Sequence, residues 1–235
     1  MLDVAVHTLD GRTAVDLGRR GAPPLPVDPA LAPLLPDGLP RGGTVAVTGS
    51  ISLLLALVGA ASADGAWCAL VGFPHISAEA ATEYGVVLER LAVVPDPGAS
   101  WPTVLGALVD AVDVVAARPP RALAPGEVRR ISARVRTRES ALIAFGGWPG
   151  AQVCLAARAG PWTGIGTGTG RLRARQASVT ARGRGAAARE RTVHLWLPGP
   201  QGAGIAATTP GSEPRGGWPG DLAPVIPLAD VPLAG

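Results

Sequence analysis

Short apolar segments with strand character alternate with helix-like segments between residues 44 and 145. The strand-like segments are Thr44–Thr48, Ala66–Val71, Leu91–Val94, Asp113–Ala116 and Ala141–Phe145. The helix-like segments between them are Leu53–Ser62, Ala78–Leu91, Trp101–Ala111 and Val128–Arg138. Strands that are joined by helices run parallel, and a parallel sheet needs helices on both faces. The sequence therefore predicts an α/β domain with a mostly parallel sheet.

The pattern changes after Gly150, where strand-like segments follow one another without helices. These segments are Gln152–Ala157, Leu172–Thr180 and Thr192–Leu197, and they predict an antiparallel C-terminal extension. Residues 1–37 are interrupted by proline and predict an extended lead-in with a helical turn near Pro29–Leu35. Residues 200–235 are dominated by Gly, Pro, Ala and Ser and predict a disordered tail. The predicted core domain is therefore 38–199.

The composition is compatible with one domain and short tails. Apolar residues make up 47% of the 235 residues, which is enough for a large core. Cys68 and Cys154 are too few and too far apart to predict a disulfide framework or a metal site, so we expect a cytoplasmic protein. Residues 44–63 are uncharged over a length that could span a bilayer, but their initial alternation and Gly49 favour a buried strand and helix over a membrane segment.

The charge is divided unevenly along the chain. Residues 1–117 carry five Arg and twelve acidic residues, and residues 118–191 carry fifteen Arg and three acidic residues, within an overall net charge of +3. The basic part could face nucleic acid, an acidic protein surface or only solvent. All basic residues are Arg and none is Lys, so the arginines by themselves are weak evidence for phosphate contacts.

The stretch GLPRGGTVAVTGSISLLLAL at residues 38–57 has the turn, strand and helix of a phosphate-binding loop without the loop itself. A P-loop needs four residues between its glycines, then a Lys for charge and a hydroxyl for the magnesium ion. Here Gly49, Ser50 and Ile51 lead directly to Ser52 at the lysine position and Leu53 at the hydroxyl position. Nucleotide binding by this degenerate loop is therefore not expected, and no cofactor is predicted.

The segments GLPRGGTVAVTGS, WCALVGFPHISAEAATEYGVVLERLAVVPDP and DAVDVVAARPP resemble, in this order, the core of the RecA recombinase family. In that family the second strand ends in a sequence whose Glu activates water for ATP hydrolysis, and Pro74 stands at that position here. The family's Walker B strand ends in an Asp that holds magnesium, where this chain has Ala117 or Arg118. The short GGWPGA stretch after Phe145 replaces a long DNA-binding loop. The resemblance therefore implies a RecA-like pseudo-ATPase that is not an enzyme.

Over residues 29–199 the chain resembles the ImuA-type mutagenesis accessory proteins of actinobacteria, the ImuA-prime kind, which are RecA-like proteins without a usable P-loop. This resemblance rests on collinearity that includes GGWPGA and GRLRARQASVTARGRGAAARERTVHLWLPG. It implies an accessory role in DNA-damage-induced translesion synthesis. The implied partner is an ImuB-type inactive Y-family polymerase homologue, and through it an error-prone replicative-type polymerase.

The glycine-rich run GPWTGIGTGTGRLRAR precedes a strand with arginines at alternate positions. A dinucleotide-binding fingerprint would instead open a helix, so we interpret the run as a flexible hairpin beside a basic strand face. Trp162 is expected at its tip, where Trp next to Arg is typical of interface hot spots; a buried anchoring Trp is the open alternative. The candidate interaction surface consists of Trp162, Arg171, Arg173, Arg175, Arg182 and Arg184.

Two other functions stay open at this point. A SulA-like inhibitor of cell division, which binds FtsZ, also resembles RecA without a P-loop. A DNA-binding module would use the arginine cluster and would lose affinity steeply with salt. The scattered histidines and the pair Asp110 and Asp113 give no metal or carboxylate site.

Overall fold

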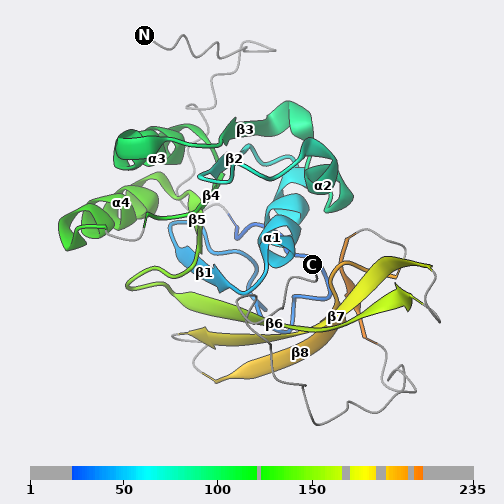
Figure 1. The fold of residues 1–235 in the computed structure, drawn as a ribbon. Coiled ribbons are helices and arrows are strands. Elements are labelled where there is room, and N and C mark those ends of the chain that lie inside the picture. Colours follow the sequence, from blue (N-terminus) through cyan, green and yellow to red (C-terminus); the bar gives the residue numbers. More distant parts are fainter. Residues whose placement is uncertain (1–22, 121–122, 166–169, 184–188, 201–203, 209–235) are drawn as a thin grey trace, which may run out of the picture.

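The fold is a single twisted sheet with helices on both faces (Figure 1). The computed structural model describes residues 23–120, 123–165, 170–183, 189–200 and 204–208. Within these residues the strand order is β3-β2-β4-β5-β1-β6-β7-β8-β9. The predicted α/β class, with a mostly parallel sheet and antiparallel C-terminal strands, is confirmed.

The first five strands match the predicted alternation to within a few residues. The strands are β1 (Thr44–Thr48), β2 (Cys68–Val71), β3 (Leu91–Val94), β4 (Val114–Ala117), β5 (Ala141–Phe145), β6 (Val153–Ile165), β7 (Gly170–Gly183), β8 (Arg191–Trp196) and β9 (Ala206–Ala207). The helices are α1 (Ile51–Ala63), α2 (Ala78–Glu83), α3 (Trp101–Ala111) and α4 (Pro125–Arg138), with short 3₁₀ turns η1 (Leu88–Arg90) and η2 (Gly98–Ser100).

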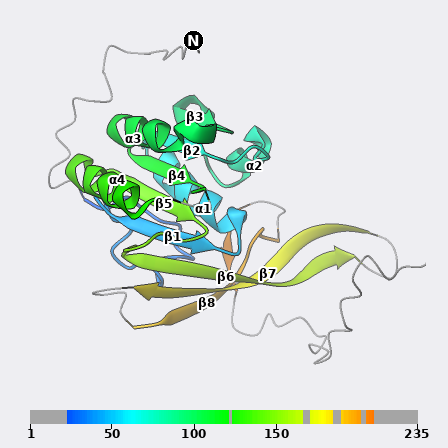
Figure 2. The same ribbon diagram turned by 60° about the vertical axis from the view of Figure 1, so that its left-hand side comes forward.

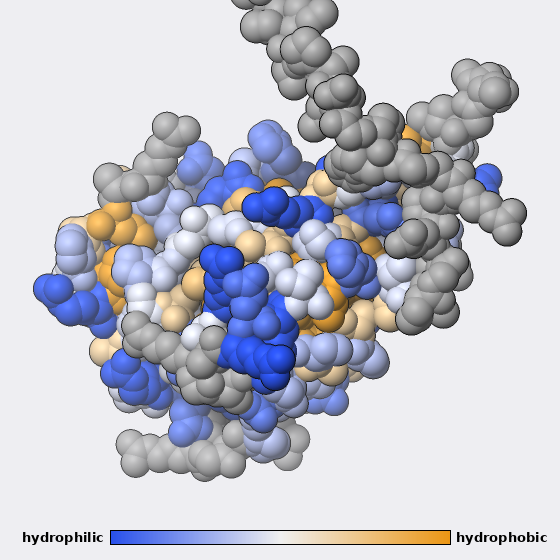
Figure 3. Space-filling model, turned by 90° about the horizontal axis from the view of Figure 1, so that it is seen from below, coloured by the Kyte–Doolittle hydropathy of each residue, from blue (hydrophilic) through white to orange (hydrophobic). Residues whose placement is uncertain are grey.

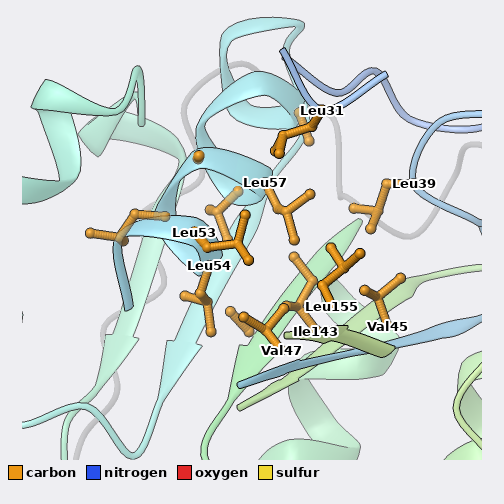
Figure 4. Close-up of a cluster of buried hydrophobic side chains, with 14 of the residues drawn as sticks. Leu31, Leu39, Val45, Val47, Leu53, Leu54, Leu57, Ile143 and Leu155 are labelled. Carbon is orange, nitrogen blue, oxygen red and sulfur yellow. The ribbon is translucent and has the colours of Figure 1, made fainter. Parts of the chain in front are cut away.

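Successive residues of the inner strands enter two different cores. In β5, Ile143 faces the core beneath α1, while Leu142 faces the core beneath α3 and α4. Figure 4 shows the first of these cores, in which Leu53, Leu54 and Leu57 of α1 meet aliphatic side chains of β1, β5 and β6. This two-sided burial explains why the inner strands are uniformly apolar.

The predicted helix Ala78–Leu91 is wrong beyond Glu83. The helix begins after Ser77, whose Oγ accepts a hydrogen bond from the Ala80 N–H at 3.1 Å, and it ends at Tyr84. Gly85 has φ +84, a left-handed conformation that terminates helices at little cost only with glycine. The rest of the segment forms η1 and leads into β3.

The predicted antiparallel extension after Gly150 is confirmed for β6, β7 and β8, but the sequence did not predict that β6 also joins the parallel part of the sheet. This strand pairs in parallel with β1, with Val45 opposite Val153, and antiparallel with β7. Since β5 lies on the other side of β1 and is also parallel to it, residues 146–152 form a short crossover without a helix. Gly146, Gly147 and Gly150 all have positive φ, which allows the chain to reverse in so few residues.

Strands β6 and β7 are much longer than predicted and run beyond the rest of the sheet (Figure 2). The ladder between β1 and β6 covers Val153 to Ala156, and the ladder between β7 and β8 covers Gln176 to Ala181. Residues 160–165 and 170–175 therefore pair mainly with each other, and we call them the β6–β7 arm. The arm includes part of the glycine-rich run that the sequence interpretation assigned to a flexible hairpin.

The segments that flank the predicted core domain contribute to the packing. Leu31, Leu34 and Leu35 precede residue 38 and are buried in the core beneath α1. Strand β9 follows residue 200 and pairs with β8. Residues 1–22 and 209–235, which make up most of the predicted lead-in and tail, lie outside the described residues. No helix in the described part of the chain is long and apolar enough to cross a membrane.

Candidate interaction surface

The junction between β1 and α1 contains only Gly49 and Ser50. The Ser50 side chain caps the helix, because its Oγ accepts a hydrogen bond from the Leu53 N–H at 3.2 Å. Ile51 and Ser52 form the first turn of α1, and Leu53 is fully buried in the core. The residues at the predicted lysine and hydroxyl positions are therefore ordinary parts of a capped helix.

Gly49 also brings β6 close to this junction. Its φ is +84, and a Cβ atom at this position would collide with the carbonyl oxygen of Ala157. A glycine is needed here for two reasons, the left-handed conformation and the close approach of β6. The space beside the β1–α1 turn is consequently occupied by backbone of the neighbouring strand.

The carboxyl ends of β2, β4 and β5 carry a cluster of one arginine and two phenylalanines. The Arg118 guanidinium carbon lies 5.2 Å from the ring centroid of Phe73 and 4.9 Å from that of Phe145. The two rings pack edge to face with centroids 6.0 Å apart. Pro74, at the position of the family's catalytic Glu, is exposed directly after the buried Phe73. We call Arg118, Phe73 and Phe145 the Arg118 cluster.

The β5–β6 crossover is fixed to α4 by Trp148. This side chain is buried, and its Nε1 donates a hydrogen bond to Ser132 Oγ at 3.0 Å. The segment GGWPGA therefore packs against the helix layer at the position where the RecA resemblance implies a long DNA-binding loop.

Trp162 and Arg175 meet on the β6–β7 arm. They are cross-strand partners, and the Arg175 guanidinium carbon lies 5.4 Å from the centroid of the Trp162 ring. The Arg175 Nε also donates to the Gly160 carbonyl oxygen at 3.3 Å. Trp162 is 43% exposed and lies within β6, so the expectation that it occupies a hairpin tip is wrong. The pair forms a cation–π platform that is open to solvent.

The other predicted arginines are spread along β7. Arg173 is exposed on the arm near Leu172, which is 49% exposed. Arg171 belongs to the same strand, but its side chain lies outside the described residues, as does all of Arg184. The face on which β6, β7 and β8 lie carries a central cluster of strongly hydrophilic residues between hydrophobic patches (Figure 3).

Arg182 belongs to a different part of β7. Its Nε donates to Glu190 Oε2 at 2.6 Å, in a pair whose side chains are both largely exposed. Seven residues separate it from Arg175, which corresponds to about 23 Å along an extended strand. Arg182 therefore lies near the C-terminal end of β7, away from the Trp162–Arg175 platform.

A second group of arginines follows α4. Asp110 of α3 accepts hydrogen bonds from Arg134 Nε at 2.8 Å and Arg138 Nε at 3.0 Å. Partial burial opposes ionisation of Asp110, but the hydrogen bonds and charges of the two arginines lower its pKa below the ordinary value. This network joins α3 to α4. The arginines that face solvent on α4 without a described partner include Arg129, Arg130 and Arg136.

The described residues contain no group of three His, Cys, Asp or Glu side chains that could hold a metal ion. Cys68 is buried within the sheet, and desolvation raises the pKa of its thiol to about 12. Cys154 is exposed on β6.

The sheet order and the helices on both faces give the chain a RecA-like fold. The solved structure described as the RadB recombinase superposes with a TM-score of 0.58 at 13% sequence identity, and the match covers 77% of this chain and 97% of that one. At this identity the likeness concerns the fold.

The chain belongs to the MT3502 N-terminal domain family, whose sequence pattern matches residues 33–150, half of the chain. It is also similar to the uncharacterized protein Rv3395c of Mycobacterium tuberculosis (strain ATCC 25618 / H37Rv), with 39% identity over 130 residues. This match covers 54% of the chain and 64% of the relative, which is less than two thirds of the relative's length.

Sequence reasoning missed the Arg118 cluster. It identified Arg118 only as a replacement for a magnesium ligand and did not single out Phe73 or Phe145. The sequence did contain a signal for the cluster. Phe145 ends one strand that is predicted to be parallel, and Phe73 closely follows another. Their meeting depends on β4 lying between β2 and β5, which the sequence order of the strands does not reveal.

Proposed function

We infer that the protein is a non-catalytic, RecA-like accessory protein that binds an ImuB-type inactive Y-family polymerase homologue during damage-induced translesion synthesis. The Trp162–Arg175 platform on the projecting β6–β7 arm is the observation that carries this proposal. An exposed Trp that stacks on an Arg is typical of the anchor residues that contribute most to protein–protein affinity. The ImuA-type resemblance supplies the identity of the partner.

The arm is suited to contact another protein for a physical reason. Beyond the ladders with β1 and β8, and beyond the backbone hydrogen bonds that join Arg175 to Leu197 and Pro198, β6 and β7 pair with each other. A large exposed apolar ring adds little to the stability of such a two-stranded ribbon, so its favourable burial is available for a partner. We therefore propose that Trp162 and Arg175 bind the partner and that the parallel sheet holds the arm in position.

The absence of ATP hydrolysis is part of the same proposal. Support comes from Leu53, which is buried in the core, from Pro74, which cannot act as a base, and from Arg118, which would repel a magnesium ion. The β1–α1 turn is also too short for successive N–H groups to surround a phosphate chain. We expect no saturable binding of ATP in the presence of magnesium by isothermal titration calorimetry.

The partner is tested by affinity purification of the tagged full chain from DNA-damaged cells of its own host, with mass spectrometry as the readout. We expect recovery of the inactive Y-family polymerase homologue, and weaker recovery with Trp162→Ala and Arg175→Glu. The matched control is Arg136→Glu on α4, which reverses an exposed charge far from the arm in the sequence.

Two outcomes would overturn this proposal. Recovery of FtsZ without a polymerase component would indicate the SulA-like function in cell division. Recovery of DNA alone, with affinity that falls steeply as salt rises, would indicate the DNA-binding function. Equal recovery of the polymerase homologue with Trp162→Ala and with wild type would support the identity of the partner. It would also show that the Trp162–Arg175 platform does not bind that partner.

A further inference from the structure

We propose that the Arg118 cluster is a second binding site, which takes an acidic side chain of a protein partner at the carboxyl end of the parallel sheet. The site is separate from the β6–β7 arm and does not depend on the function proposed for it. The carboxyl end of an open α/β sheet is the edge where ligands of this architecture bind. Here the residues at that edge offer a fixed guanidinium.

The parallel register explains how the cluster is assembled. Val71 of β2 and Ala144 of β5 both lie opposite Ala117 of β4. The residue after Ala117 is Arg118, so its side chain emerges between the strand ends that carry Phe73 and Phe145. Gly72 has φ +80, and a Cβ there would approach the Arg118 carbonyl oxygen to 3.0 Å. Glycine at this position therefore allows β2 to pass close to Arg118.

The two aromatic rings hold the guanidinium before any ligand arrives. The guanidinium carbon lies over both rings, 5.2 Å from the Phe73 centroid and 4.9 Å from the Phe145 centroid. Arg118 is exposed and forms no ion pair among the described residues. A planar guanidinium with free donors is suited to bidentate pairing with a carboxylate. Fixing its position in advance also reduces the entropy lost when a ligand binds.

The surroundings favour a protein carboxylate over a nucleic acid backbone. Pro119 and Pro120 follow Arg118, and Pro74 follows Phe73, so the residues beside the cluster in the sequence are apolar and conformationally restricted. An aromatic base made of the buried Phe73 and the half-buried Phe145, together with one arginine and an apolar rim, is typical of a protein–protein anchor. Nucleic acid binding relies instead on several cations spaced along the phosphates.

The experiment uses the ¹⁵N-labelled full chain and the Nε–Hε resonance of Arg118, assigned by its loss in Arg118→Gln. Hexaglutamate is titrated in 150 mM salt, with hexaglutamine and the oligonucleotide dT12 as matched probes. We expect a saturable shift of the Arg118 resonance with hexaglutamate and none with hexaglutamine. We also expect at least tenfold weaker hexaglutamate binding in Arg118→Gln.

Two further variants separate geometry from charge. Arg118→Lys keeps the charge but loses the planar group, so we expect it to bind nearly as weakly as Arg118→Gln. Arg136→Gln removes an exposed arginine on α4 and is expected to bind as wild type does. Circular dichroism of each variant checks that the fold is intact, which is expected because Arg118 and Arg136 are exposed.

Three results would overturn the proposal. The first is equal affinity of hexaglutamate for wild type and a folded Arg118→Gln variant. The second is full binding by Arg118→Lys, which would reduce the site to non-specific charge attraction. The third is a shift of the Arg118 resonance that saturates at lower concentrations of dT12 than of hexaglutamate, which would assign the cluster to nucleic acid. Because none of these measurements involves the polymerase homologue or Trp162, they leave the function proposed for the arm untouched.

Discussion

The parallel core and the β6–β7 arm belong to the same sheet but differ in how much of their side-chain surface is buried. In the core, strands such as β2 and β4 are buried at every position, and their small aliphatic side chains allow helices on both faces to pack closely. On the arm, Trp162 and Leu172 are each more than 40% exposed, and arginines alternate with apolar residues along β7. Stability therefore resides in the first region, and groups available for binding reside in the second and at the carboxyl edge between the strands.

The largest contrast is expected in cysteine chemistry, since Cys68 lies in the core and Cys154 on the open face of β6. Burial raises the pKa of Cys68 to about 12, so its reactive thiolate is scarce at pH 8. We expect a thiol reagent such as DTNB to modify one cysteine of the native protein rapidly and the second at least about a hundredfold more slowly. Addition of denaturant should make both react. Cys154→Ser, as the control, should abolish the rapid phase, and rapid modification of native Cys68 would contradict the assignment of β2 to a closed core.

Truncation of a core leucine should show the next largest effect. Leu57 of α1 is fully buried, so Leu57→Ala should lower the free energy of unfolding by about 3 kcal/mol through lost burial and a residual cavity. The control is Leu172→Ala on the arm, which should change it by less than about 0.5 kcal/mol. Urea denaturation followed by circular dichroism measures both. Similar losses in the two variants would mean that the arm is as important to stability as the core.

The packing of β6 against the β1–α1 turn, at the point where β6 leaves the parallel core, is tested at Gly49. Gly49→Ala combines an unfavourable φ of +84 with a collision against the Ala157 carbonyl oxygen of β6, and we expect a loss of at least about 2 kcal/mol. Gly146 also has a positive φ, but a Cβ there would meet no atom within 4 Å. Gly146→Ala is therefore the matched control for backbone strain alone, with an expected loss of about 1 kcal/mol. Equal losses in urea denaturation would show that β6 does not press against this turn.

The smallest effect concerns the ion pairs between α3 and α4. The pKa of Asp110 is lowered in the folded protein, so its contribution to stability is complete above its unfolded pKa of about 3.9 and is lost as the pH falls through the lower folded pKa. Asp110→Asn should reduce the urea midpoint slightly at pH 7, and the difference from wild type should shrink below about pH 4. Glu190→Gln, which affects an exposed pair with Arg182, should leave the midpoint unchanged at both pH values. A difference for Asp110→Asn that grows on acidification would contradict this sign.

The alternation of strands and helices was sufficient to predict the parallel sheet, because each inner strand needs apolar residues on both faces. The pairing of β6 with β1 was not predictable in this way, since the seven residues 146–152 cross over without a helix and leave no periodic signal. The length of the arm was missed because its glycines resemble those of a loop. In the candidate site, the alternating arginines of β7 were visible in the sequence, but the contact of Arg175 with Trp162 depends on a register with bulges. Arg118 meets Phe73 and Phe145 only through the order of the strands.

The central claim is that the β6–β7 arm binds the inactive Y-family polymerase homologue through Trp162 and Arg175. Its most direct test is the dissociation constant between the purified full chain and the purified homologue from the same genome, measured by biolayer interferometry at 150 mM salt. We predict measurable binding by wild type and Arg136→Glu, and a dissociation constant raised at least tenfold by Trp162→Ala and by Arg175→Glu. Undetectable binding by wild type, or the same dissociation constant for wild type and both arm variants, would contradict the claim.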